Sequence, residues 1–381
     1  MSRIIVFGND HTNTVGVIQS VARGGFEVDA LLFGDITGFV KSSKFVRNIY
    51  SSLDAEACVL KLLNMKMETD TVKPVLPCSD SAALALDKYR EELKEKGFVI
   101  GGSTKKPSLA PFFEKDLQVK LAKESGLNVP ESKIIDDESV LEKNDIYPCI
   151  IKPLVSCQGS KSQIRICRDN AELLKQYHSI ANRPKIILQQ YIERDYEISI
   201  LGCGLQNGDC IIPAVEDKLT LYPKYVGLEC LAKIHPLEDK QIIEGISNLI
   251  KSIGYVGLFS VEMMHCKNDG KFYFTEINLR NDGAQSFIFQ YGVNLPLIHV
   301  NDLLGLPTPN SEGLRPGYYI WDMHHLKSLL ARDISLFKWL KEIRYSRGFL
   351  MYDSKDKRPF FRQYLYMVIK ALRRKKVVKY S

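Results

Sequence analysis

The chain lacks a long apolar run. Of its 381 residues 45% are hydrophobic, but no uninterrupted apolar stretch approaches the roughly 20 residues that a membrane-spanning helix requires. The start, MSRIIVFGND, passes directly into a strand-like run and has no signal-peptide pattern. These absences, with 25% charged residues, are typical of a soluble globular protein, and the length allows two or three domains.

Paired cysteine motifs are also missing. The nine cysteines show no CxxC spacing, and Cys149, Cys167 and Cys203 stand in apolar surroundings. This pattern predicts reduced thiols in a cytoplasmic protein and argues against a disulfide framework or a zinc site. The chain also lacks a GxGxxG dinucleotide fingerprint and internal repeats.

The net charge of +7 is modest, and much of it lies near the end of the chain. The segment KALRRKKVVK, residues 370–379, holds six basic residues after the aromatic-rich run FFRQYLYMVI. Such a tail is either a solvated helix end or a weak contact with an anionic membrane surface. Basic and aromatic residues do not interleave elsewhere, so we expect no nucleic-acid partner.

The N-terminal part alternates strand and helix patterns. Strands spaced by helices predict a parallel sheet with right-handed crossovers. Polar loops, Asn9-Asp10-His11 and Ser79-Asp80-Ser81, follow two of the strands, at the edge where open α/β sheets bind ligands. The same residues are also good helix caps. The expected strands are 3–9, 26–33 and 72–78, and the expected helices are 14–23, 54–67 and 80–95.

A stretch rich in Gly, Ser and Pro, residues 101–116, marks a boundary between two domains. Beyond it the patterns predict strands at 147–153, 163–167, 185–192 and 196–204, and helices at about 114–125, 170–181 and 237–252 and after Leu295. We therefore predict an α/β, Rossmann-like domain at 1–104, an α+β domain at 105–305 with a small lobe at about 130–190, and an extension at 306–381.

The most informative segment is LFSVEMMHCKNDGKFYFTEINLR, residues 258–280. Asn268-Asp269-Gly270 predicts a hairpin turn. With the turn centred on Asp269, Glu262 and Glu276 lie equally far on either side and face each other. Two opposed carboxylates, roughly 5 Å apart, repel unless a positive group lies between them.

The next residues on that face add an amide and a guanidinium. Because side chains alternate along a strand, Asn278 and Arg280 share the face of Glu276. Two carboxylates and an amide oxygen are suited to Mg²⁺, which commonly also holds nucleotide phosphates. Arg280 is placed to hold a phosphoryl or carboxylate oxygen. The alternative is an exposed hairpin with ordinary surface carboxylates.

Two further segments fit a nucleotide. Lys152 ends an apolar strand and is followed by SCQGSK, residues 156–161, a loop of small residues whose backbone N–H groups can approach phosphate oxygens. In ILQQYIERDYEISI the apolar strand breaks at 193–195 and resumes, which exposes backbone groups suited to a base edge. Glu197, just past the break, is placed to accept ribose hydroxyls.

Taken in order, these features resemble the ATP-grasp superfamily over roughly residues 1–305. The resemblance implies a Rossmann-like pre-ATP-grasp domain followed by a two-lobed ATP-grasp fold, with ATP and two Mg²⁺ ions, for which Mn²⁺ can substitute. It implies that Arg280 steadies an acyl-phosphate. The other implied roles are phosphate contacts for Lys115, Lys152, Gly159 and Ser160, adenine contacts for Gln189, Gln190, Tyr191 and Ile192, a ribose contact for Glu197, and metal ligation by Glu262, Glu276 and Asn278.

Two features depart from many relatives: the phosphate loop is poor in glycine, and Gln189 stands where an acid is frequent. Within the superfamily the chain is similar to bacterial carboxylate–amine ligases, including D-aspartate ligases, through Tyr222-Pro223-Lys224 and MYDSKDKRPFFRQYL at 351–365. This similarity implies that a small carboxylate, activated as an acyl-phosphate, is joined to an amine. We expect a homo-oligomer, and we place His11, Asp80, Lys218 and Lys224 on the acceptor side.

Three other functions stay open. One is a carboxylase or carbamoyl-phosphate-type enzyme that uses bicarbonate as its carboxylate. Another is an ATP-binding protein without turnover, against which the complete acidic hairpin argues. The third is a membrane-associated cell-envelope enzyme whose basic tail rests on lipid.

Overall fold

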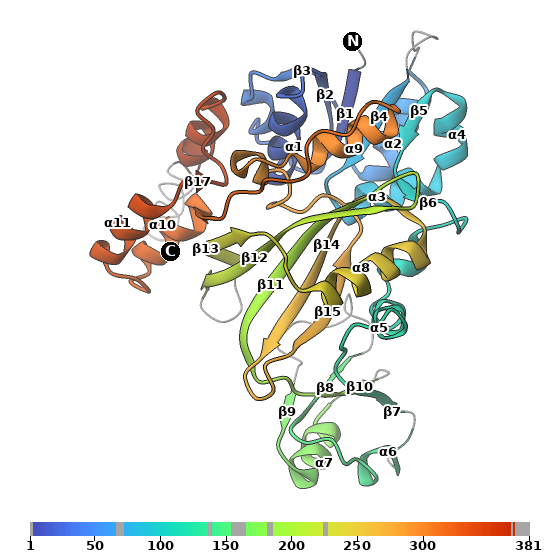
Figure 1. The fold of residues 1–381 in the computed structure, drawn as a ribbon, viewed down its shortest axis with the longest axis vertical. Coiled ribbons are helices and arrows are strands. Elements are labelled where there is room, and N and C mark those ends of the chain that lie inside the picture. Colours follow the sequence, from blue (N-terminus) through green and yellow to red (C-terminus); the bar gives the residue numbers. More distant parts are fainter. Residues whose placement is uncertain are drawn as a thin grey trace, which may run out of the picture.

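The computed structural model describes residues 3–65, 72–135, 137, 139–153, 165–180, 186–223, 228–366 and 369, with Lys152 and Pro153 described by their backbone alone. Its N-terminal part is a five-stranded parallel sheet in the order β3-β2-β1-β4-β5, flanked by helices (Figure 1). The elements are β1 (Arg3–Asn9), α1 (Thr12–Ala22), β2 (Glu27–Phe33), β3 (Val46–Ser52), α2 (Ala55–Leu63), β4 (Lys73–Pro77), α3 (Asp80–Lys88), α4 (Arg90–Glu95) and β5 (Phe98–Ile100).

The parallel sheet confirms the predicted class of fold, but two of its strands were not predicted. Strand β3 is only partly buried and its sequence, VRNIYSS, mixes apolar and polar residues, so it lacks the apolar run of a central strand. The helix predicted over 80–95 is two helices, α3 and α4, with a break at Tyr89.

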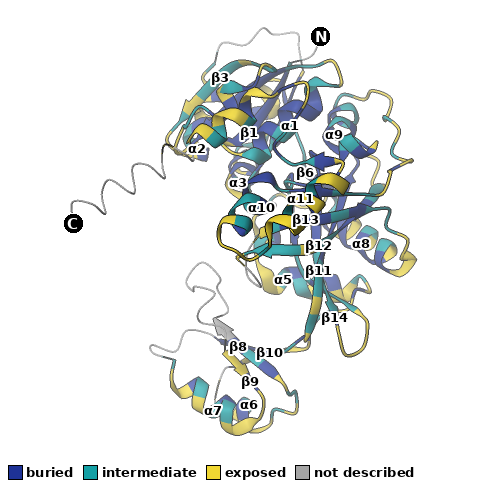
Figure 2. Cartoon of the chain, turned by 90° about the vertical axis from the view of Figure 1, so that its left-hand side faces the viewer, coloured by how far each residue is buried: buried dark blue, intermediate teal, exposed yellow. Residues whose placement is uncertain are grey.

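A small lobe hangs below the rest of the molecule in both views (Figures 1 and 2). It is a four-stranded antiparallel sheet in the order β7-β10-β8-β9, with α6 and α7 packed against it. Its elements are β7 (Ser132–Ile135), α6 (Ser139–Glu142), β8 (Cys149–Pro153), β9 (Arg165–Cys167), α7 (Asn170–His178) and β10 (Ile186–Gln190).

The large lobe is built on an eight-stranded sheet. Its main path runs β15-β14-β11-β12-β13-β16-β17, and β6 (Gly102–Ser103) pairs with β14. The strands are β11 (Arg194–Gly204), β12 (Cys210–Tyr222), β13 (Leu228–His235), β14 (Tyr255–Cys266), β15 (Phe272–Asn278), β16 (Gly317–Ile320) and β17 (Gly348–Phe349).

Two helices cover one face of this sheet, α5 (Lys115–Glu124) and α8 (Lys240–Ile253). Helix α8 begins at Asp239, whose carboxylate accepts a hydrogen bond from the N–H of Ile242, and it ends at Gly254 with φ of 67°. Its buried residues recur every three or four positions, so one side of the helix is apolar. They are Ile242, Gly245, Ile246, Leu249, Ile250 and Ile253.

After α9 (Leu295–Leu303), the C-terminal part carries α10 (Asp322–Leu330) and α11 (Leu336–Tyr345), followed by helical residues 358–366. Strand β16 of this part hydrogen-bonds along β13, so it belongs to the same sheet as the acidic hairpin. The boundary at residue 305 stays a prediction. Within the described residues no helix is both long and apolar enough to cross a bilayer.

Candidate functional site

The register of the β14–β15 hairpin confirms that Glu262 lies directly opposite Glu276 and that Asn278 lies opposite Ser260. Nearer the turn the pairs are displaced by one residue, and Met263 lies opposite Phe274. Thr275 is therefore the extra residue of a β-bulge, and its hydroxyl donates to the carbonyl oxygen of Glu262 at 2.7 Å. The bulge is what brings the two carboxylates into register.

The carboxylate pair continues as a row across four neighbouring strands. Glu276 on β15 faces Glu262 on β14, which faces Ser199 on β11, which in turn faces Glu216 on β12. Directly opposed residues point to the same side of a sheet, so the row forms one polar strip. The alternate residues, such as Val261 and Met263, are buried in the core on the other side.

Two lysines neutralise the carboxylate pair. Lys115, the first residue of α5, places its Nζ 3.0 Å from Glu276 Oε2. Lys218 Nζ lies 3.2 Å from Glu262 Oε2. Burial raises the pKa of Glu262 even though Lys218 acts in the opposite direction. Each carboxylate of the pair thus has a cationic partner.

Arg280 ties this strip to the N-terminal part. Its Nε donates to Asp80 Oδ1 at 3.0 Å, and its Nη2 donates to Asn278 Oδ1, also at 3.0 Å. Nη1 lies 3.6 Å from Asp282 Oδ2. Burial alone would lower the pKa of Arg280, but the surrounding carboxylates outweigh it and the pKa is raised, so the guanidinium stays charged.

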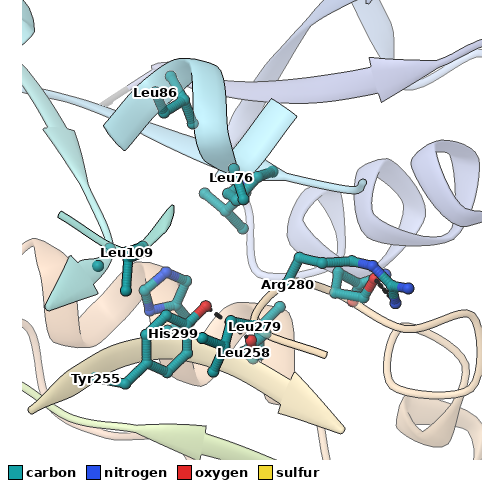
Figure 3. Close-up of a pocket in the computed structure, with 14 residues that line it drawn as sticks. Leu76, Leu86, Leu109, Tyr255, Leu258, Leu279, Arg280 and His299 are labelled. Carbon is teal, nitrogen blue, oxygen red and sulfur yellow. Dashed lines mark hydrogen bonds between the residues drawn. The ribbon is translucent and has the colours of Figure 1, made fainter. Parts of the chain in front are cut away.

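Behind Arg280 lies a small, mainly apolar cavity between the N-terminal part and the large sheet (Figure 3). His299 and Tyr255 line it, and the Tyr255 hydroxyl donates to the carbonyl oxygen of Leu258 at 3.0 Å. Burial lowers the pKa of His299 to about 4, so this histidine is neutral at physiological pH. The Arg280 guanidinium points away from the cavity (Figure 3). The cavity is therefore part of the packing behind the polar strip and not part of the functional site.

In front of Arg280 is a cleft of about 450 Å³ between the N-terminal loops and the acidic strip. It brings together three of the four residues predicted for the acceptor side: His11, Asp80 and Lys218. Asp10, in contrast, accepts hydrogen bonds from the backbone N–H groups of residues 37–40 and serves the loop. Ser79 lines the cleft and also caps α3, so the loop at 79–81 both faces the cleft and caps a helix, as the two interpretations of its sequence predicted.

Sequence reasoning missed three acidic residues of this cleft, Glu216, Glu229 and Asp282. Asp282 stands two residues beyond Arg280, and that spacing was an available signal. Glu216 and Glu229 reach the cleft only because β12 and β13 are neighbours, which no local pattern reveals. Burial raises the pKa of Glu229 to about 7 and places that of Glu216 well above its usual value, against the opposing effect of Lys218.

Lys218 is enclosed by these acids. Burial alone would lower the pKa of this lysine, but Glu262, Glu216, Glu229 and Asp282 together raise it, so the ammonium is kept charged. The cleft therefore holds a fixed cation surrounded by carboxylates, two of which favour their protonated form.

The residues predicted around adenine lie where the small lobe joins the large one. Strand β10 ends at Gln190 and β11 begins at Arg194, so the break falls at 191–193 and not at 193–195. The break begins at Tyr191, whose N–H still donates to the carbonyl oxygen of Pro148 at 2.9 Å and so makes the last backbone hydrogen bond next to β10. Gln189 and Ile192 are buried. Glu197, predicted for ribose, is ion-paired with Arg194 and lies opposite Lys218.

Some predicted residues fall outside the described residues. These are Gly159 and Ser160 of the phosphate loop and Lys224 of the acceptor side. For Lys152 only the backbone is described, in β8 opposite Ile187.

The donor set at the acidic strip fits Mg²⁺ bound together with a phosphate. Within the described part of the chain no three His, Cys, Asp or Glu side chains converge to hold a metal on their own. Glu262, Glu276 and Asn278 offer only oxygen ligands, and Mg²⁺ typically takes one or two carboxylates and completes its shell with water and phosphate oxygens. Two carboxylates this close need neutralising charge, which Lys115 supplies to Glu276 and Lys218 to Glu262.

The fold and the strip together define a class of protein. Residues 120–288 match the family model of the ATP-grasp domain. The chain therefore carries a domain of the ATP-grasp superfamily, preceded by an α/β domain with a parallel sheet.

Relatives with known activities are distant. The chain is 25% identical over 276 residues to the formate-dependent phosphoribosylglycinamide formyltransferase of Mannheimia succiniciproducens, a match that covers 70% of this chain and 66% of that protein. The enzyme of the same name from Bacteroides thetaiotaomicron is 22% identical over 83% of this chain and 81% of its own length. At this distance the activity of the relatives does not transfer directly.

Solved structures share the fold. The biotin carboxylase domain of 2-oxoglutarate carboxylase from Hydrogenobacter thermophilus, in complex with MgADP, ADP and bicarbonate, superposes with a TM-score of 0.62 at 18% identity, covering 83% of this chain and 73% of that one. N5-carboxyaminoimidazole ribonucleotide synthetase from Thermotoga maritima gives 0.57 at 19% identity, over 83% of this chain and 79% of its own.

Proposed function

We propose that the protein is an ATP-dependent ligase that activates a small carboxylate as an acyl-phosphate and joins it to an amine. The observation that carries this proposal is the opposed pair Glu276–Glu262, with Lys115, Asn278 and Arg280 around it. Glu262 and Arg280 also line the polar cleft. A carboxylate is a poor electrophile at neutral pH, and ATP converts it into an acyl-phosphate with a good leaving group.

In this proposal Glu262, Glu276 and Asn278 would hold Mg²⁺, which would supply positive charge to neutralise the phosphates. Lys115, which pairs with Glu276 at 3.0 Å, would contact phosphate oxygens. Arg280, fixed by Asp80 and Asn278, presents a rigid guanidinium to the carboxylate and the developing phosphate. Positioning and charge neutralisation are the chief contributions of the protein to such a transfer.

The cleft supports an amine as the second substrate. Glu216, Glu229 and Asp282 line it beside the charged Lys218. A cationic amine would be attracted to those carboxylates that are ionised, and it must lose a proton before it can attack. Glu229, whose pKa is raised to about 7 by burial, has the proton affinity that a general base needs near neutral pH.

Phosphate release tests the proposal. Purified protein is incubated with Mg²⁺ and ATP against a matrix of carboxylates and amines, and inorganic phosphate is measured. We expect release that requires one particular pair, with an amide product in the mass spectrum. Glu276→Gln should lower the rate at least about 100-fold, because it removes an anionic ligand of the Mg²⁺ that would neutralise the developing phosphate charge.

The matched control is Asp269→Asn, which changes a carboxylate in the turn of the same hairpin. This variant should keep its activity. Equal loss in both variants, or an unchanged rate in Glu276→Gln, would contradict the assigned role of the strip. Binding of ATP without release across a broad matrix would favour an ATP-binding protein without turnover.

A second candidate is carboxylation with bicarbonate, favoured by the structural likeness to biotin carboxylases and to N5-carboxyaminoimidazole ribonucleotide synthetase. It predicts phosphate release with bicarbonate and a product that carries an added carboxylate. The finer proposal, a carboxylate–amine ligase like the D-aspartate ligases, predicts that an acidic amino acid supports release in the same matrix.

A further inference from the structure

Helix α11, with the sequence LFKWLKEIRY, turns apolar residues to solvent and buries an acidic one. Leu336, Phe337 and Leu340 are 59%, 79% and 53% exposed, whereas Glu342 is 3% exposed. A surface helix of a globular protein normally has the opposite arrangement. Figure 2 shows α11 on the face turned to the viewer, largely in the colour of exposed residues.

The exposed apolar residues lie together on the helix. At 3.6 residues per turn, Leu336 and Leu340 lie one above the other and Phe337 stands beside them. On the flank next to Phe337 are Lys341 and Arg344, both exposed. The outer side of α11 is thus an apolar stripe bordered by basic residues.

The charge around the stripe is mostly positive. The exposed charged residues between 331 and 347 include a single acid, Asp333. The Glu342 carboxylate is buried beneath the helix, 2.7 Å from His325 Nε2 of α10 and 3.8 Å from Lys338 Nζ, so it partly offsets the charge of Lys338 but does not reach the surface. The exposed basic residues of this segment are Arg332, Lys338, Lys341, Arg344 and Arg347.

A second apolar stripe lies on the helical residues 358–366, on the same side of the molecule, at the left in Figure 1. Phe360 and Tyr364 pack against the core of the N-terminal part, and this contact fixes the orientation of the segment. Phe361 and Leu365, one turn apart, are 61% and 52% exposed. The basic residues 370–379 follow directly in the sequence.

We propose that α11 and residues 358–366 form a face that docks on an anionic lipid surface. Exposed Phe and Leu enter the headgroup boundary, and the neighbouring lysines and arginines bind lipid phosphates. A second copy of the chain fits this face less well, because two basic surfaces would be brought together. The inference does not depend on the proposed function, since no residue of the cleft is involved.

Vesicle sedimentation with the full chain tests this inference. We expect the protein to sediment with phosphatidylglycerol vesicles, to stay in solution with pure phosphatidylcholine, and to be released by high salt. The variant Leu336→Ser/Phe337→Ser/Leu340→Ser should lower the partition coefficient at least about 10-fold, because it removes three apolar side chains that would be buried in the lipid. Lys341→Glu/Arg344→Glu should weaken binding at low salt.

The control variant removes three exposed apolar residues from the N-terminal part: Leu53→Ser/Leu60→Ser/Val72→Ser. It should bind vesicles as the unmodified protein does, and circular dichroism should show all variants folded. A version that ends at residue 366 separates the tail from α11, and within it the serine variant should still bind more weakly. The proposal is overturned if the unmodified protein does not bind phosphatidylglycerol, if the α11 variant binds normally, or if deleting the tail alone abolishes binding. Light scattering that shows a dimer dispersed by the α11 variant, without lipid binding, would assign the face to self-association.

Discussion

Glu229 is a residue whose titration should be visible in the stability of the protein. Burial raises its pKa in the folded state to about 7, above its ordinary value of 4.5. The folded state therefore binds this proton more tightly than the unfolded chain does. As the pH rises from about 4.5 to about 7, the ionisation of Glu229 therefore lowers the free energy of unfolding.

We expect Glu229→Gln to remove this pH-dependent fall in the free energy of unfolding. The variant should gain stability relative to the unmodified protein as the pH rises from 5 to 8, by about 2 kcal/mol. Urea unfolding at several pH values measures the difference. Glu312→Gln, at an exposed carboxylate, is the matched control and should run parallel to the unmodified protein. A Glu229→Gln curve that is parallel as well would show that the carboxyl group titrates normally.

At the scale of single residues, the sequence could predict those functional groups that lie within one hairpin. Glu262, Glu276, Asn278 and Arg280 are linked by a turn signal and by strand alternation. The cleft carboxylates Glu216 and Glu229 stand on other strands, and their approach depends on the order of strands in the sheet. Local patterns carry no information on that order, so these residues could not be predicted.

At the scale of elements, the β-bulge shows how a correct pairing can rest on an incomplete argument. Centring the turn on Asp269 predicts the pair Glu262–Glu276, yet the pairs near the turn follow a register displaced by one residue. Thr275, the extra residue of the bulge, brings Glu262 opposite Glu276, and its hydroxyl donates to the Glu262 carbonyl oxygen. Without the bulge Glu262 would face Thr275, and the carboxylates would not be opposed.

The attachment of α11 to α10 rests on a buried pair. His325 Nε2 lies 2.7 Å from Glu342 Oε2, and both side chains are almost fully buried, at 2% and 3% exposed. His325→Leu would leave the Glu342 carboxylate buried without this partner. We expect that variant to lose roughly 3 kcal/mol of stability, measured by chemical unfolding.

The double variant His325→Leu/Glu342→Leu should recover most of the loss, because neither polar group then remains in the apolar contact. Lys338→Met is the control, since Lys338 approaches the same carboxylate at 3.8 Å from a half-exposed position and should matter by less than about 1 kcal/mol. A double variant as unstable as the single one would mean that the shape of the contact, and not the unpaired charge, sets the cost.

At the scale of the whole molecule, the C-terminal part completes the core of the N-terminal one. Trp321, Met323, Met351, Phe360 and Tyr364 pack against the apolar cluster around β1, α1 and β2. From the sequence, residues 306–381 could be predicted only as an extension. Their apolar residues meet the first strands only in the folded chain, and the sequence does not reveal that contact. Contacts across three hundred residues leave no local signature.

A buried carboxylate reinforces this contact. Asp356 is 1% exposed and accepts hydrogen bonds from Gln19 at 3.1 Å, from Ser43 at 2.5 Å and from the backbone N–H of Lys44 at 3.1 Å. These donors belong to the N-terminal part. Loss of Asp356 would leave these donors without their acceptor. The resulting loss of stability adds to the loss from the missing apolar contacts.

We therefore expect a chain that ends at residue 305 not to fold cooperatively. Five apolar side chains at about 2 kcal/mol each amount to roughly 10 kcal/mol, which is comparable to the whole stability of a typical protein. Circular dichroism on heating and limited proteolysis test this expectation. A chain that ends at residue 366 keeps these contacts and should unfold at the same temperature as the full chain. If residues 1–305 alone showed the same sharp transition, the C-terminal part would be a separate domain, and its packing on the first strands would contribute little to the stability of the fold.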